Sequence, residues 1–177
     1  MRRADRIKLL GVLSLFAAPA LAAWLAHTVW RPAAGAIYGE LLQPTIPRFA
    51  GMTDASGNPA DLATLRGRWI LLTVAKGECG LPCREQVDLA RRVRLAQGQD
   101  RQRVAQALIQ ADATVSADLS NLHGYRVPGA ALSAWPDPLR TYLVDPAGRV
   151  MLRFPAAVDG GGMLHDLRQL LKASQIG

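Results

Sequence analysis

Cys79 and Cys83 are the only cysteines of the 177-residue chain, and they stand four positions apart in a stretch that contains Pro82. Two cysteines at this spacing at the start of a helix lie one turn apart on one face, so their sulfur atoms can form a disulfide or bind one metal ion. The exposed amides of a helix N-terminus favour a thiolate, and a proline in the first turn costs no hydrogen bond. The pair is therefore the candidate site for redox or metal chemistry.

A purely structural disulfide is the main alternative. Closing so short a loop contributes only about 2 kcal/mol, which is less than a crosslink between distant segments would contribute. Two free buried cysteines are a second alternative, but Glu78 and Arg84 beside the pair indicate a polar, accessible turn. The small stabilisation and the polar surroundings both favour redox or metal chemistry at Cys79 and Cys83 over these two alternatives.

A strand and a helix must position this pair. Residues 69–75 form an apolar run without strict alternation, which is typical of a strand buried on both faces of a sheet. Residues 83–97 are polar and helix-forming with apolar positions at helical spacing, and Gly98 follows as a stop. We therefore expect the cysteines at a strand-to-helix junction.

The rest of the chain predicts an α/β fold, a mixed sheet flanked by helices. We expect a second parallel strand at 103–110, a short helix at 114–121 and a short strand at 125–127. A β-hairpin is predicted at 141–154, because Asp145, Pro146 and Gly148 suit a type I turn. Leucines at helical spacing predict a last helix from 163 to 174.

The N-terminal region has the pattern of a membrane anchor. Residues 9–30 contain no Asp, Glu, Lys or Arg, and a predominantly apolar run of 22 residues is long enough to span a bilayer. Residues 1–8 hold four cations against one acid, so this flank is expected in the cytoplasm. We expect a single transmembrane helix at 9–30, a linker at 31–47 and a folded domain at 48–177, whose start could lie as early as residue 38. The domain would face the periplasm of a bacterial inner membrane, or the outward face of another energy-transducing membrane. A cleaved signal peptide is an alternative, since residues 20–22 resemble a cleavage site.

The charge pattern argues against a nucleic-acid partner. The net charge is +7, and five arginines lie between positions 91 and 103. No aromatic residues are interleaved with them, and the expected compartment holds no nucleic acid. A solvated helix face or contact with anionic lipid explains this cluster better.

The chain resembles the Sco/SenC family of membrane-anchored, thioredoxin-fold proteins that assist assembly of the copper centre of cytochrome c oxidase. The resemblance spans roughly residues 48 to 172 and rests on residues 65–69, the Cys-x-x-x-Cys motif and residues 142–148. It implies a thioredoxin-like fold with a redox-active pair and copper as a candidate ligand of Cys79 and Cys83. It also implies, as partner, an oxidase copper-site subunit or another periplasmic thiol protein.

One position departs from the family. Sco proteins complete the copper site with a histidine about five residues before the aromatic residue of the hairpin, and Asp137 stands there in this chain. A carboxylate is a poor partner for Cu(I), which prefers sulfur and imidazole. We interpret His123 and His165 as ordinary surface histidines. The missing ligand favours a thiol–disulfide oxidoreductase, in which Cys79 attacks a disulfide of the partner and Cys83 resolves the mixed disulfide.

Two neighbouring positions bear on this choice. A thioredoxin-type reductase has a cis-proline facing its cysteines, and Pro138 lies close to the expected place. Peroxiredoxins need a threonine where this chain has Lys76, which argues against peroxidase activity. The residues leave two alternatives open. One is a Cu(I) metallochaperone that holds the metal by Cys79 and Cys83 alone, and the other is a non-catalytic assembly factor that uses residues 129–138 as a partner surface.

Overall fold

The computed structural model describes residues 17–19, 37–112 and 122–174. Of the expected transmembrane segment only the helical positions 17–19 fall within this range, and the short helix expected at 114–121 lies outside it. Within the described residues no helix is long and apolar enough to cross a membrane. The compact unit that begins at Ile37 is described below by itself.

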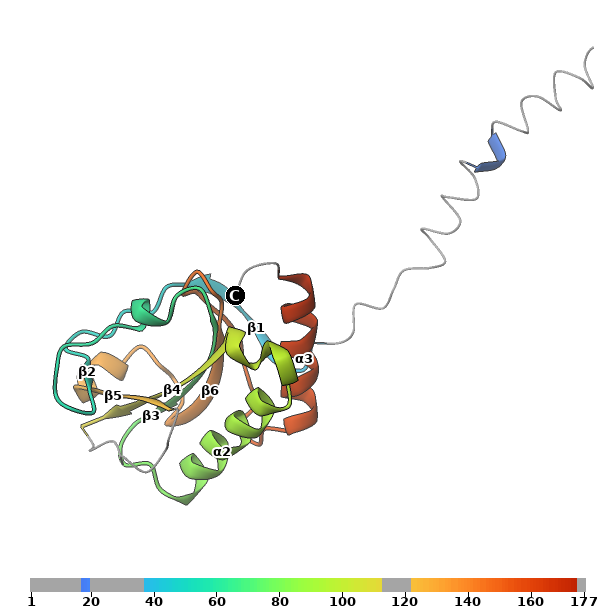
Figure 1. Ribbon diagram of the computed structural model, residues 1–177. Coiled ribbons are helices and arrows are strands. Elements are labelled where there is room, and N and C mark those ends of the chain that lie inside the picture. The colour runs from blue at the N-terminus through green and yellow to red at the C-terminus, as the bar shows by residue number, and fades with distance from the viewer. Residues whose placement is uncertain (1–16, 20–36, 113–121, 175–177) are drawn as a thin grey trace, which may run out of the picture. The chain divides into compact units, whose positions relative to one another are not determined.

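The described residues of this unit form a seven-stranded mixed sheet, with the strands in the order β1-β7-β6-β3-β4-β5-β2 (Figure 1). β3, β4 and β5 are parallel to one another, and the other neighbouring strands are antiparallel. The strands are β1 (Glu40–Thr45), β2 (Thr53–Asp54), β3 (Trp69–Ala75), β4 (Val104–Ala111), β5 (His123–Val127), β6 (Leu139–Val144) and β7 (Val150–Arg153). This sheet confirms the predicted fold class, the strand at 69–75 and its parallel neighbour.

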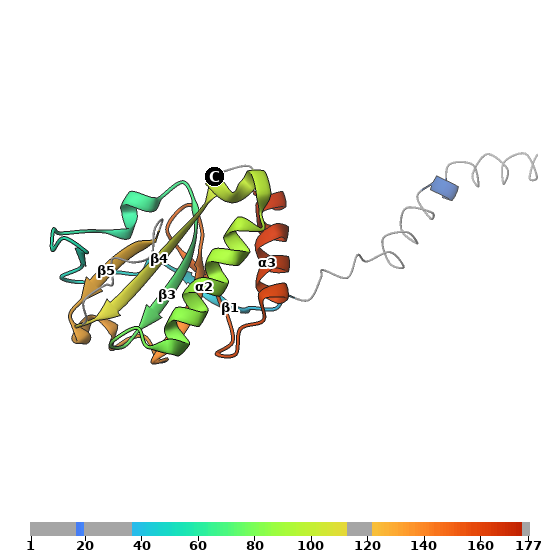
Figure 2. The same cartoon turned by 60° about the horizontal axis from the view of Figure 1, so that its bottom comes forward.

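Two helices cover one face of the sheet, α2 (Leu81–Leu95) and α3 (Gly160–Ala173) (Figure 2). Leu71 of β3 packs there against Ala90 of α2 and Leu167 of α3. The opposite face is covered by irregular segments that include the 3-10 helices η1 (Leu62–Leu65) and η3 (Gly129–Leu132), and these segments contribute Met52, Leu62 and Leu132. A third 3-10 helix, η2 (Gly98–Arg103), lies between α2 and β4 in the chain. All seven residues of β3 are buried, as expected for a strand between two covered faces.

The sheet extends into the segment that the sequence analysis assigned to a linker. β1 (Glu40–Thr45) pairs with β7, and the backbone amides of Tyr38 and Gly39 donate hydrogen bonds to the buried carboxylate of Asp166 on α3 at 3.0 and 2.8 Å. β1 is an edge strand that is mostly exposed and contains Pro44, so its sequence shows no alternation of apolar and polar residues.

The last helix begins earlier than predicted. The leucine spacing predicts a start at residue 163, but residues 160–162 already form the first turn of α3. Asp159 caps this turn, because its carboxylate accepts a hydrogen bond from the amide of Gly162 at 2.8 Å. Gly162 is also required by packing, since a Cβ atom at this position would overlap the ring of Tyr38. A capping residue and a close contact therefore offset the low helix propensity of three glycines.

Candidate functional site

The two cysteines form a disulfide at the junction between β3 and α2. β3 ends at Ala75, α2 begins at Leu81, and the Cα atoms of Cys79 and Cys83 are 5.0 Å apart. The connecting loop turns at Gly77, whose φ of +127° is a backbone conformation that favours glycine. The structure therefore places the pair at the predicted strand-to-helix junction.

The two sulfur-bearing residues differ in exposure. Cys83 is only 4% exposed and packs against Ala75, Val87 and Leu108. Cys79 is partly exposed at the edge of the same cluster. A partner molecule can therefore reach Cys79 but not Cys83.

The start of α2 favours negative charge on Cys79. Gly80 is the N-cap residue, no side chain caps the helix, and its first turn contains no acidic residue. Pro82 lies in this turn, where a missing amide costs nothing. The guanidinium of Arg84 donates a hydrogen bond to the carbonyl of Cys79 at 3.2 Å, which adds a cation beside the disulfide. Unpaired amides and a nearby cation stabilise a thiolate.

Pro138 lies against the loop that carries the pair. Its carbonyl accepts a hydrogen bond from the amide of Lys76 at 2.7 Å, and the next residue, Leu139, packs against the cluster around Cys83. No cis peptide bond occurs among the described residues, so Pro138 follows a trans bond. Pro138 therefore lies near the loop, but the peptide bond before it is trans and not cis as in a thioredoxin-type reductase.

Asp137 is turned toward arginines rather than toward sulfur. Its carboxylate forms ion pairs with Arg140 of β6 and, at 3.4 Å, with Arg153 of β7. The hydrogen bond from Arg140 is the main reason that the pKa of Asp137 lies below its usual value. Asp137 therefore stabilises the start of β6.

Neither histidine of the described residues completes a metal site at the cysteines. His123 is the first residue of β5. Its pKa is lowered by partial burial and by the positive charges of Arg68 and Arg94. Arg68 directly precedes β3 and Arg94 is in the last turn of α2, far along both elements from the cysteines. His165 is exposed on α3 and lies 2.9 Å from Gln169. Among residues 37–112 and 122–174 no three side chains of His, Cys, Asp or Glu are grouped so that they could hold a metal ion.

The sequence does not reveal a set of buried polar residues that bond to α2 and to the loop before it. Thr141 of β6 donates a hydrogen bond to Gln86 of α2 at 3.2 Å and lies 3.3 Å from the hydroxyl of Thr73 on β3. Gln110 of β4 is 1% exposed and donates to the carbonyl of Gly77. The only signal in the sequence was the presence of polar residues in runs predicted to be buried strands.

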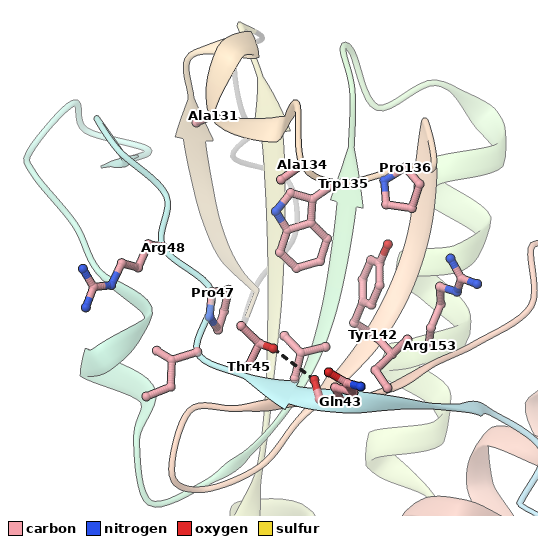
Figure 3. A pocket seen from close by; sticks show the side chains of 13 residues that line it. Gln43, Thr45, Pro47, Arg48, Ala131, Ala134, Trp135, Pro136, Tyr142 and Arg153 are labelled. Atoms are coloured by element: carbon pink, nitrogen blue, oxygen red, sulfur yellow. Dashed lines mark hydrogen bonds between the residues drawn. The ribbon is translucent and has the colours of Figure 1, made fainter.

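A pocket of about 430 Å³ lies on the opposite face of the sheet from the cysteines. Figure 3 shows Trp135 and Tyr142 turned toward each other on one side of it, and their rings meet edge to face with centroids 4.7 Å apart. Burial, and then the charge of Asp137, raise the pKa of Tyr142. Trp135 belongs to the segment 129–138, which is the partner surface in the assembly-factor alternative. Residues of this segment line the pocket.

Fold and site together define a thioredoxin-like α/β protein with a disulfide where the central strand meets the first helix of the fold. The chain belongs to the family described as transmembrane-like, thioredoxin-like, C-terminal domain, whose family model matches residues 69–174. A comparison with curated proteins finds no match.

Solved structures of Sco proteins and of thiol–disulfide oxidoreductases share this fold. Yeast Sco1 is 15% identical with a TM-score of 0.59, and the alignment covers 76% of this chain and 96% of that one. A SCO1/SenC family lipoprotein from Bacillus anthracis is 14% identical with a TM-score of 0.53, covering 75% of this chain and 99% of that one. A thiol–disulfide oxidoreductase from Bacteroides fragilis is 15% identical with a TM-score of 0.54, covering 71% and 99%. At these identities the similarity establishes the fold alone, and it confirms the expected structural relationship to both groups.

Proposed function

We propose that this chain is a membrane-anchored thiol–disulfide oxidoreductase that exchanges electrons with the cysteine pair of another protein. The observation that carries the proposal is the disulfide between partly exposed Cys79 and buried Cys83 at the start of α2. A crosslink over so few residues stabilises the fold by only about 2 kcal/mol. Its position at an uncapped helix N-terminus suits reactivity better than stability.

The reaction follows from the difference in exposure. In the reduced protein, the Cys79 thiolate attacks a disulfide of the partner, forming a mixed disulfide and releasing one partner sulfur as a thiolate that takes up a proton. Cys83 then attacks the Cys79 sulfur, which re-forms the internal disulfide and releases the second partner thiol. The partner gains two electrons and two protons, and a separate dithiol donor restores the reduced pair.

The resemblance to Sco/SenC proteins supports one class of partner. We propose that the partner is the copper-site cysteine pair of a respiratory oxidase subunit, or another periplasmic thiol protein. The apolar segment at 9–30 and its basic flank support anchoring in a bacterial inner membrane with the folded unit in the periplasm. Recovery of the full chain in the membrane fraction after an alkaline wash, with the domain digested by protease added to the periplasm, would test this placement. Release by the wash would contradict an anchor.

Trapping of the mixed disulfide tests the proposed reaction. The reduced Cys83→Ser variant should form a stable adduct with a peptide disulfide, whereas reduced Cys79→Ser should form almost none because Cys83 is buried. The wild-type chain should release the reduced peptide and end as the internal disulfide. Equal trapping by both variants, or no reaction of the wild-type chain, would contradict the proposal.

Copper carriage is the alternative that the same two residues allow. After reduction, Cys79 and Cys83 would offer two thiolates with Cα atoms 5.0 Å apart, a soft donor pair that suits Cu(I). Copper would then be cargo that the protein passes on. Titration of the reduced chain with Cu(I) against a competing chelator, beside a Cys79→Ser, Cys83→Ser control, separates the two functions. Tight one-to-one binding that the control lacks would make the chain a copper carrier, and weak binding would leave the redox function.

A further inference from the structure

Gln110 has a buried amide oxygen without a hydrogen-bond partner among the described residues. The side chain is 1% exposed, and its Oε1 atom is inaccessible to solvent. Its Nε2 atom donates to the carbonyl of Gly77 at 3.5 Å, in the loop that leads to Cys79. A buried carbonyl without a donor is unfavourable, and such an atom in a folded protein calls for an explanation.

The orientation of this amide is determined by its neighbour. If the two ends of the amide were exchanged, Oε1 would face the Gly77 carbonyl and two acceptors would oppose each other. Nε2 must therefore point to Gly77, and Oε1 is the end that lacks a donor. The missing donor is thus a property of the fold and does not depend on how the amide is assigned.

Register places Gln110 beside the strand residues that surround the buried cysteine. Gln110 is the direct partner of Ala75 across the β3–β4 pair, and Leu108 lies two positions earlier on the same face of β4. Ala75 and Leu108 are the buried strand residues in the cluster around Cys83. The Gln110 side chain is therefore on the face of the sheet that packs against Cys83, beside the residues that surround this cysteine.

We propose that Gln110 is a positioning residue that accepts a hydrogen bond from the Cys83 thiol once the disulfide is reduced, and that it thereby raises the reduction potential of the pair. The disulfide itself has no hydrogen to donate. When a dithiol reductant delivers two electrons and two protons, it is oxidised to its own disulfide and two S–H donors appear at the pair. Oε1 then gains a partner in the reduced state that it lacks in the oxidised state, which favours the dithiol.

This inference deepens the proposed function, because it concerns the redox poise of the same pair. The test is the equilibrium of the full chain with a glutathione redox buffer. Gln110→Met keeps a long unbranched side chain but removes the amide, and Gln110→Leu is a second variant with the same loss. Gln106→Met is the matched control, since Gln106 lies on the same strand and face, is 4% exposed, and donates to the Val87 carbonyl at 2.6 Å.

Both Gln110 variants should shift the equilibrium toward the disulfide by about three- to tenfold relative to the wild-type chain. Tenfold corresponds to a potential about 30 mV more negative. The Gln106→Met control should keep the wild-type equilibrium even if it unfolds more easily. Urea unfolding of both redox forms gives a second readout, because Gln110→Met should destabilise the reduced form more than the oxidised form.

An unchanged equilibrium in the Gln110 variants, a shift toward the dithiol, or an equal shift in Gln106→Met would overturn the proposal. Each of these outcomes can occur whether the proposed oxidoreductase function is right or wrong. The potential of the pair can be measured whether or not the chain reduces a partner, and the trapping experiment with Cys83→Ser decides that question independently.

Discussion

Asp137 forms ion pairs with Arg140 and Arg153. The hydrogen bond from Arg140 is the first cause of its lowered pKa. A carboxyl whose pKa is lowered in the folded state stabilises that state above its unfolded pKa of about 3.9, and this contribution is lost as the pH falls through the folded value. The charge of Asp137 therefore contributes to stability at neutral pH.

Replacing Asp137 with Asn should lower the free energy of unfolding by about 1 kcal/mol at pH 7, because both ion pairs are partly exposed to solvent. The difference between wild type and variant should shrink as the pH falls from 5 to 3, which urea unfolding at several pH values would show. Asp100→Asn is a suitable control, since Asp100 forms a single, more exposed pair with Arg103. A difference as large at pH 3 as at pH 7 would mean that the charge of Asp137 is not what stabilises the fold.

Leu81 is 70% exposed between the two cysteines and contributes little to the core. We expect Leu81→Ser to leave the thermal unfolding temperature nearly unchanged. The variant should react up to about tenfold more slowly with an apolar peptide disulfide, because a buried leucine contact of about 1.5 kcal/mol or more is lost. Its reaction with glutathione disulfide should change little. Leu95→Ser, at the other end of α2 and 47% exposed, is the control. Equal rates for the two variants with the peptide would exclude a role of Leu81 in partner contact.

At the level of elements, two threonines link the centre of the sheet to α2. Thr73 and Thr141 are fully buried and face each other across β3 and β6. Since the Thr141 hydroxyl donates to Gln86, the Thr73 hydroxyl must donate to Thr141. The three residues form one chain of hydrogen bonds from β3 through β6 to the helix that begins at the disulfide.

Thr141→Val should cost about 1 to 3 kcal/mol in the free energy of unfolding, because it leaves the buried Thr73 hydroxyl without an acceptor. The double variant Thr73→Val, Thr141→Val should be more stable than Thr141→Val alone, since the unpaired Thr73 hydroxyl is then removed as well. Urea unfolding of the four proteins gives a coupling energy, expected near 1 kcal/mol. Additive effects of the two substitutions would show that the hydroxyls do not depend on each other.

How far the sequence predicts these elements depends on where they lie. The run at 69–75, the cysteine spacing and the turn at 145–148 are strong local patterns, and each predicted element was found at these places. β1 was assigned to the linker because an exposed edge strand of mixed polarity has no periodic pattern. Thr141 and Gln110 could not be assigned to the site, because strand pairing between residues distant in the chain brings them to β3. There Thr141 bonds to Gln86 of α2, and Gln110 bonds to the loop before the helix.

For the whole molecule, the disulfide lies where β3 and its parallel neighbour β4 both end. Carboxyl ends of parallel strands are the usual place for sites in α/β proteins, since loops there can vary without disturbing the sheet. The pocket around Trp135 and Tyr142 is on the face of the sheet opposite α2 and α3, so the sheet separates it from Cys83. A redox reaction at one face and a partner contact at the other are therefore sterically compatible.

The start of the folded unit at Ile37 can be tested by comparing a chain that begins at residue 37 with one that begins at residue 48. The shorter chain loses the pairing of β1 with β7 and the packing of Tyr38 on Phe154. It also leaves the buried carboxylate of Asp166 without its two backbone donors, which is costly in a region closed to water. We expect the free energy of unfolding in urea to fall by at least about 3 kcal/mol in the shorter chain. Equal stability of the two chains would return residues 37–47 to the linker and would mean that β1 is not needed to close the edge of the sheet.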